Sequence, residues 1–198
     1  MLSFSKYLIS EGGPLCEHFH LPAQAGSDLI LERMKRGYSH QGYLDLCNGI
    51  RSRIPNASIT TDLMVGFPGE READFYETVR LAREVQWDSA FSFLYNVRPG
   101  TAAAEWEDDV PPEIKRERLM ALNAVVEAIA RKRNRTLVGE VMEVLVDGRS
   151  KRDPGRWRGL TRTNKVMVFP GPPGLYGKFV QVRVKRATEY TLIGELQA

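Results

Sequence analysis

Apolar and polar positions along the first 138 residues alternate between short strand-like runs and helical patterns. Helical spacing covers residues 29–50 with a break at Gly37, then 72–86, then Pro112 to about Thr136. Strand candidates lie between these helices, at residues 18–21, 58–65 and 89–95. The strand–helix–strand order predicts parallel strands with right-handed crossovers. Three strands are too few for a closed barrel, so we expect part of a larger α/β domain.

A different pattern begins after Gly139. Short alternating strands are separated by glycine- and proline-containing turns, and their apolar positions fall at residues 141–146, 166–169, 179–184 and 190–196. About 60 residues of this kind are typical of a small all-β barrel. We therefore predict two domains, residues 1–138 and residues 139–198.

Positive charge is concentrated in the second domain. The chain has 28 Lys/Arg and 25 Asp/Glu, a net charge of +3. Residues 139–198 hold 11 of the basic and 6 of the acidic residues, a net of +5, which leaves −2 for residues 1–138. The cations gather at residues 131–135 and 149–165. A polyanion such as RNA would release counterions by docking there, although a solvated surface would show the same pattern.

The composition excludes several other classes of protein. Two cysteines, Cys16 and Cys47, cannot supply the four thiolates of an iron–sulfur or zinc site, so we expect no metal ligands in this chain. No apolar run approaches the roughly 20 residues of a membrane span, so we expect no membrane partner. A reduced, cytoplasmic protein is the default for so few cysteines.

Three polar or glycine-containing loops follow the predicted strands, at residues 20–27, 62–70 and 95–101. Ligands of parallel α/β folds lie at the carboxyl ends of the strands, so we expect the loops to converge on a shared hollow. Gln24, Asp62 and Arg98 offer directional hydrogen bonds there. Turn chemistry and helix capping explain residues such as Ser27 equally well. We expect His20 to have a structural or pocket-lining role rather than to bind a metal.

These loops carry a resemblance to a known family. The runs HLPAQAGSDLILERMKRGYS, TTDLMVGFPGE and FSFLYNVRPGTAAA resemble the second half of the radical S-adenosylmethionine domain of methylthiotransferases. The run GEVMEVLVDGRSKRDPGRWRGLTRTNKVMVFPG, followed by YTLIGEL, resembles the RNA-binding TRAM domain of those enzymes. The segments SKRDPG and TRTNK are most similar to the MiaB branch. The implied fold is the carboxyl-terminal half of a (β/α) radical SAM barrel, followed by a small all-β TRAM barrel.

The resemblance also implies an activity. The MiaB branch adds a methylthio group to carbon 2 of N6-prenylated adenosine 37 in tRNA, using S-adenosylmethionine and two 4Fe–4S clusters. The family's cluster cysteines are not in this chain, so we expect the missing amino-terminal part of the same protein to carry them. We expect the chain to be inactive alone and its partner to be the tRNA anticodon stem-loop.

Individual roles follow from the resemblance together with the strand-end positions. The expected cofactor- or substrate-binding residues are Gln24, Ser27, Arg36, Asp62, Gly66, Tyr95 and Arg98. The expected RNA-binding residues are Arg149, Lys151, Arg152, Arg156, Trp157, Arg158, Arg162 and Lys165, with Trp157 stacking on an unpaired base. Alternative substrates are threonylcarbamoyl-adenosine in tRNA and an aspartate of a ribosomal protein. A stand-alone RNA-binding module is the alternative from another class.

Overall fold

The computed structural model describes residues 15–197, and their contacts divide into two compact units. The α/β unit comprises His20–Ser52 and Ile59–Ile129. The barrel unit comprises residues 15–19, Arg53–Ser58 and residues 130–197. The last turns of the long helix thus belong to the barrel unit, where the side-chain amide of Asn134 donates to the carbonyl of Thr188 at 2.9 Å.

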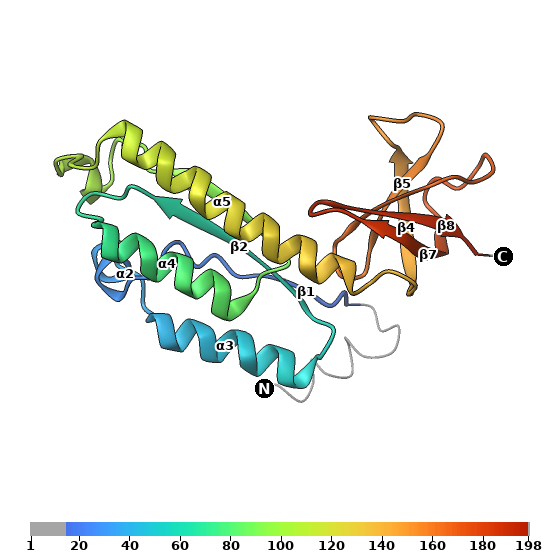
Figure 1. Cartoon of the computed structure of the whole chain (residues 1–198), viewed down its shortest axis with the longest axis horizontal. Coiled ribbons are helices and arrows are strands. Elements are labelled where there is room, and N and C mark those ends of the chain that lie inside the picture. Colours follow the sequence, from blue (N-terminus) through green and yellow to red (C-terminus); the bar gives the residue numbers. More distant parts are fainter. Residues whose placement is uncertain (1–14, 198) are drawn as a thin grey trace. The chain divides into compact units, whose positions relative to one another are not determined.

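The α/β unit contains a three-stranded sheet in the order β1-β2-β3 (Figure 1). Its elements are β1 (His18–His20), α2 (Asp28–Arg33), α3 (His40–Arg53), β2 (Ser58–Val65), α4 (Glu72–Val85), β3 (Ser89–Leu94), the short 3-10 helix η1 (Ala102–Glu105) and α5 (Pro112–Arg135). Strands β2 and β3 run parallel, with Thr60 opposite Ser89 and Val65 opposite Leu94. The predicted strands, the parallel pairing of β2 with β3 and the long helix starting at Pro112 are confirmed.

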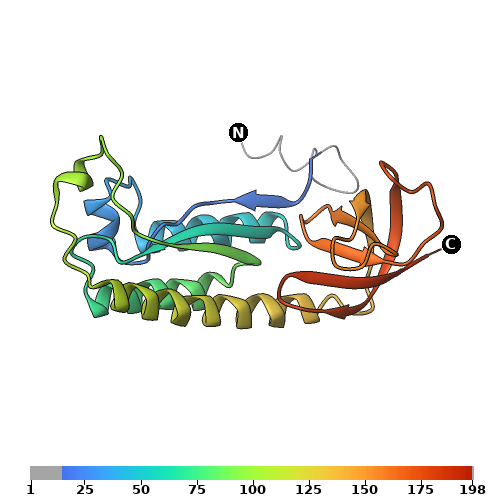
Figure 2. The ribbon, with the colours of Figure 1, turned by 90° about the horizontal axis from the view of Figure 1, so that it is seen from above.

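Helices cover one face of this sheet. Ile59, Leu63 and Val65 of β2 are fully buried in one cluster with apolar residues of α3, α4 and α5. Figure 2 shows α4 and α5 running along the same side of β2. The spacing of Phe75, Val79 and Ala82 puts one apolar stripe of α4 on the sheet, as the 3.6-residue repeat requires.

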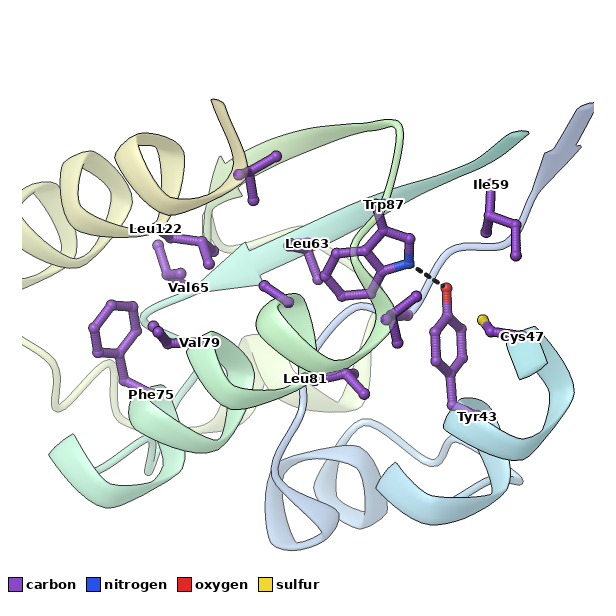
Figure 3. Packing of buried hydrophobic residues seen from close by; sticks show 14 residues of the cluster. Tyr43, Cys47, Ile59, Leu63, Val65, Phe75, Val79, Leu81, Trp87 and Leu122 are labelled. Atoms are coloured by element: carbon purple, nitrogen blue, oxygen red, sulfur yellow. Dashed lines mark hydrogen bonds between the residues drawn. The ribbon is translucent and has the colours of Figure 1, made fainter. Parts of the chain in front are cut away.

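The centre of the core is a buried aromatic pair. Trp87, just before β3, donates its indole N–H to the hydroxyl of Tyr43 on α3 at 3.1 Å (Figure 3). The Tyr43 hydroxyl in turn donates to the carbonyl of Leu21 at 2.6 Å. Burial raises the pKa of Tyr43 well above its usual range. The pair therefore links α3, β3 and the segment after β1.

The barrel unit contains a closed five-stranded barrel in the order β4-β5-β6-β8-β7. Its strands are β4 (Val141–Arg149), β5 (Trp157–Thr161), β6 (Val166–Phe169), β7 (Phe179–Ala187) and β8 (Thr191–Leu196). All neighbours are antiparallel except β6 and β8, which are parallel. The inward side chains alternate along each strand, among them Val144, Val146, Met167, Phe169 and Val182. The predicted small barrel is confirmed.

One strand of the barrel is not predicted from the sequence. Residues 157–161 belong to the basic segment 149–165, but they form β5 between β4 and β6. Trp157, Gly159 and Thr161 point inward, and glycine and threonine hide the apolar alternation that marks a strand. Gly159 is required there, because a Cβ atom would lie 2.4 Å from the carbonyl oxygen of Leu145.

Candidate functional site

The sheet face opposite the helices is exposed in the described part of the chain. Asp62 and Met64 of β2 lie opposite Phe91 and Phe93 of β3 in register, and both phenylalanines are more than half exposed, at 59% and 52%. Exposed neighbouring aromatic side chains of this kind mark a surface that another group covers. We call this surface the open sheet face; it comprises His20, Asp62, Met64, Phe91 and Phe93, and the buried residue Thr60 lies next to His20.

Polar groups of the open sheet face gather at the carboxyl end of β1. The Nδ1 atom of His20 lies 3.0 Å from the hydroxyl oxygen of Thr60, and its Nε2 atom lies 3.5 Å from the Asp62 carboxylate. Asp62 keeps about a third of its side chain exposed, so one carboxylate edge is open to a ligand. A carboxylate beside exposed aromatic rings fits a nucleoside, whose sugar hydroxyls donate and whose base stacks.

Gln24 lies next to Asp62, as predicted. Its backbone has a positive φ of 64° and joins β2, donating to the carbonyl of Asp62 and accepting from the N–H of Met64. Its side-chain amide has no hydrogen-bond partner among residues 15–197. Gln24 and Asp62 therefore form one polar edge, drawn from two of the three predicted loops.

The three loops do come together, but on a packed apolar cluster. Ala25 from the first loop, Phe67 from the second and Tyr95 from the third are buried together with Ile30 and Leu31 of α2. The rings of Phe67 and Tyr95 meet edge to face with centroids 5.2 Å apart. Convergence of the loops is confirmed by this packed cluster, and the shared hollow stays a prediction.

Ser27 and Tyr95 have structural partners. Ser27 is the N-cap of α2; its hydroxyl donates to Asp74 at 2.6 Å and accepts from the N–H of Ile30 at 3.5 Å. Tyr95 is buried, and its hydroxyl donates to the carbonyl of Ala103 at 3.0 Å. Capping and packing account for both residues, so the ligand contacts expected of them do not fit this geometry.

Gly66 lies close to the side chain of Lys115. Its φ is +74°, and a Cβ atom built on it would lie 2.3 Å from the Cγ atom of Lys115 on α5. Its N–H donates to the carboxylate of Glu70 at 3.0 Å. Glycine is needed here for the turn and for the lysine, and the expected approach to a nucleoside has no support at this position.

Arg36 and Arg98 are exposed. Arg36 lies at an open pocket of about 540 Å³ next to α2, lined by Asp28, Glu32, Lys35, Arg36, Gly37, Tyr38 and Ser39. That Arg36 pairs with a ligand carboxylate stays a prediction. The side chain of Arg98 is exposed in the turn that its carbonyl forms with Thr101.

A buried charge cluster behind the second loop was not predicted. The carboxylate of Glu70 is 1% exposed, and it accepts from Arg118 at 2.7 Å and from the N–H of Gly66. Burial raises the pKa of Glu70, while Gly66 and Arg118 oppose that shift. Lys115 contacts the Asp108 carboxylate at 2.5 and 2.6 Å. The sequence signal is the pair of basic residues spaced three apart on α5, Lys115 and Arg118, to which no role is assigned above.

Most predicted RNA-binding cations of the barrel have intramolecular partners. Arg156 pairs with Asp153 at 3.0 Å, and Arg158 pairs with Asp147. The guanidinium of Arg162 pairs with Glu17 at 3.1 Å and donates to the carbonyl of Leu15 at 2.6 Å, and Lys165 donates to Asn134 at 2.9 Å. The three remaining cations, which are exposed and have no carboxylate partner within the described chain, are Arg149, Lys151 and Arg152.

Trp157 does not fit its predicted role of stacking directly on a base. The residue is 6% exposed and belongs to the barrel core. Its indole N–H donates to the carbonyl of Pro172 at 2.8 Å. The guanidinium carbon of Arg149 lies 3.7 Å from the ring centroid and covers its outer face.

The donor set of the described residues does not fit an iron–sulfur cluster. Cys47 is fully buried in the α/β core, where burial raises the pKa of its thiol, and Cys16 is exposed in the other unit. No three His, Cys, Asp or Glu side chains within residues 15–197 are grouped closely enough to hold a metal. No helix in the same range is long and apolar enough to cross a membrane.

Comparisons with known proteins identify the two units. Residues 6–82 match the Radical SAM superfamily, and residues 135–197 match the TRAM domain. The chain is therefore a radical SAM segment followed by a TRAM barrel.

Curated relatives show which enzymes the chain is similar to. Over 188 residues, 95% of this chain and 42% of the relative, it is 50% identical to a tRNA-2-methylthio-N(6)-dimethylallyladenosine synthase of Moorella thermoacetica. It is 48% identical to the enzyme of the same name from Geobacillus thermodenitrificans, over 96% of this chain and 36% of the relative. The chain spans about two fifths of the length of these curated relatives. Over nearly its whole length the chain is thus similar to enzymes of this name, in agreement with the resemblance seen in the sequence.

Proposed function

We propose that this chain is the carboxyl-terminal part of a cytoplasmic tRNA methylthiotransferase that adds a methylthio group to carbon 2 of N6-prenylated adenosine 37. The observation that carries the proposal is identity of about half of all positions, over 95% of the chain, to a synthase of that name. The two matched domains also occur in the order that the family requires. We further propose that residues 1–138 complete a radical SAM barrel and residues 139–198 bind RNA.

In this proposal the open sheet face lines the interior of the completed barrel. Asp62 and Gln24 accept and donate hydrogen bonds to a nucleoside, and Phe91 and Phe93 exclude water from it. Arg36 meets a ligand carboxylate at the pocket next to α2. S-adenosylmethionine, when bound, supplies the radical chemistry, with the 4Fe–4S clusters held by residues outside this chain. This chain's residues contribute orientation and exclusion of water.

The barrel unit is proposed to bind the anticodon stem-loop. The exposed cations Arg149, Lys151 and Arg152 are available for phosphates, because no carboxylate within residues 15–197 neutralises them. Binding of this kind weakens steeply as salt rises.

Nucleoside mass spectrometry of tRNA tests the activity. In a strain that lacks the gene, we expect the 2-methylthio-N6-prenyl adenosine to disappear and the N6-prenyl adenosine to accumulate. Loss of the methylthio group from threonylcarbamoyl-adenosine, or from a ribosomal-protein aspartate, would instead assign the enzyme to another branch. Unchanged tRNA and unchanged ribosomal protein would refute the proposed transferase and leave an RNA-binding module.

Complementation of that strain tests the open sheet face. We expect the full-length gene carrying Asp62→Ala or Gln24→Ala to restore less than a tenth of the methylthio nucleoside, because each removes a ligand contact. Asp45→Ala, a change at an exposed carboxylate on α3, is the matched control and restores the wild-type amount. Full activity and unchanged cofactor affinity in both site variants would show that the open sheet face does not bind the cofactor or substrate.

A further inference from the structure

An irregularity in β4 decides which side chain covers Trp157. The register of β4 against β5 shifts by one residue between Val146 and Gly148, so that Arg149 is the cross-strand partner of Trp157. A regular ladder would place Gly148 there. Because cross-strand partners share a face, the extra residue brings a guanidinium over the indole.

The indole is a fixed support for that guanidinium. Trp157 is held by its N–H bond to the Pro172 carbonyl and by packing against Leu175, and Gly171 lies close against its edge. The Arg149 guanidinium carbon is 3.7 Å from the ring centroid, which is van der Waals contact, and Nη1 donates to the Gly155 carbonyl at 3.4 Å. Two contacts thus restrain the long side chain before any ligand arrives, which reduces the entropy lost on binding.

We infer that Arg149, and not Trp157, is the surface on which the barrel stacks an unpaired nucleotide base. A planar guanidinium lying on a ring keeps its opposite face open, and Arg149 is exposed. Guanidinium planes stack on unpaired RNA bases, whereas bases inside a duplex are covered by their neighbours. The inference rests on the proposed RNA-binding function and assigns the barrel a preference for single-stranded nucleotides over duplex.

Charge around the stacked pair supports a nucleic acid as the ligand. The segment 149–156 contains Arg149, Lys151, Arg152 and Arg156 against the single carboxylate of Asp153. Asp153 pairs with Arg156, which leaves Lys151 and Arg152 exposed beside the stack. Phosphates on either side of a stacked base would meet these two cations.

The test measures the binding of the 198-residue chain to two RNAs, an anticodon stem-loop and a fully paired duplex of the same stem. The stem-loop carries 2-aminopurine in its loop, whose fluorescence is quenched by stacking. Arg149→Lys keeps the charge and removes the plane; Arg186→Lys, at an exposed arginine of β7, is the matched control. We expect Arg149→Lys to weaken stem-loop binding about tenfold, to abolish most of the protein-induced quenching and to leave the salt dependence unchanged. Arg186→Lys should change affinity less than twofold.

Each other outcome has a definite meaning. Wild-type affinity and quenching in Arg149→Lys would overturn the stacking role while leaving RNA binding intact. An equal loss of affinity for stem-loop and duplex would make Arg149 a phosphate contact and would also overturn it. If the wild-type chain binds neither RNA, the proposed RNA-binding function fails, and the inference fails with it. Circular dichroism melting of both variants checks that the barrel remains folded.

Discussion

Removing Arg118 tests the buried charge cluster behind the second loop. Its guanidinium lies 2.7 Å from the carboxylate of Glu70, which is 1% exposed. Arg118→Met keeps a long, unbranched apolar side chain at this position of the helix but leaves the Glu70 carboxylate without a cation. Removing one partner of a buried ion pair destabilises a protein by about 3–5 kcal/mol, because the other charge stays desolvated. We expect a loss of that size at pH 7.

The pH dependence of the stability loss shows whether the buried charge of Glu70 causes it. Burial already raises the pKa of Glu70, and losing Arg118 removes a group that opposes this rise. A carboxyl with a raised folded pKa stabilises the protein most below its unfolded pKa, and this contribution is lost as pH rises through the folded value. The difference between Arg118→Met and wild type should therefore shrink from pH 7 towards pH 4.5. Glu70→Gln in the Arg118→Met background should recover most of the loss at pH 7.

Urea unfolding followed by the helical far-ultraviolet signal reports on the right unit, since α2 to α4 and most of α5 belong to the α/β unit. Arg116→Met is the matched control, because Arg116 is an exposed arginine on the same helix. It should change stability by less than about 0.5 kcal/mol. A loss below about 1 kcal/mol in Arg118→Met, or a loss that does not depend on pH, would refute the reasoning.

Three further outcomes are expected. Gly66→Ala should cost about 1–3 kcal/mol in urea unfolding, because its positive φ and the adjacent lysine leave no room for a Cβ atom; a neutral effect would contradict this. Tyr43→Phe should cost about 1–3 kcal/mol by the same assay, because it leaves the Trp87 N–H buried without its acceptor; stability equal to wild type would show that water or another group takes over. Arg152→Ala should reduce the slope of log affinity for the stem-loop against log salt by about one, whereas Arg158→Ala, whose guanidinium already pairs with a carboxylate, should not; equal slopes in the two variants would refute this ranking of the cations.

Periodicity predicted the fold well where one physical effect dominates. In α4 the apolar stripe and in β2 the β-branched residues point to a single burial pattern, so the helix and the strand were predicted within a residue or two. In β5 the inward positions are a tryptophan, a glycine and a threonine, and the outward ones are Arg158 and Leu160. Inward and outward positions do alternate along β5, but the inward position 159 is a glycine that close packing requires. A hydropathy pattern does not show this requirement.

Site residues were harder to predict because one residue type serves two purposes. Serine can cap a helix or bind a ligand, and glycine can form a turn or leave room for a ligand. In this structure Ser27 caps α2, and Gly66 forms a turn next to Lys115. That Asp62 and Gln24 lie side by side could be predicted, since the ends of parallel strands lie at one edge whatever the loops do; their binding role stays a prediction. The partners of Arg158 and Arg162 could not, because ion pairs between residues far apart in sequence depend on the folded register.

The extra residue in β4 also affects how barrels of this kind should be compared. Because the irregularity decides whether a glycine or an arginine meets the tryptophan, a β4 of the same length that paired regularly with β5 would place Gly148 there without changing any amino acid of the hydrophobic interior. Two barrels with the same residues at these positions, differing only in whether β4 bulges, would then present different surfaces to a nucleic acid. Specificity could diverge through changes of register while the interior stayed constant, and position-by-position substitution counts would overlook the change.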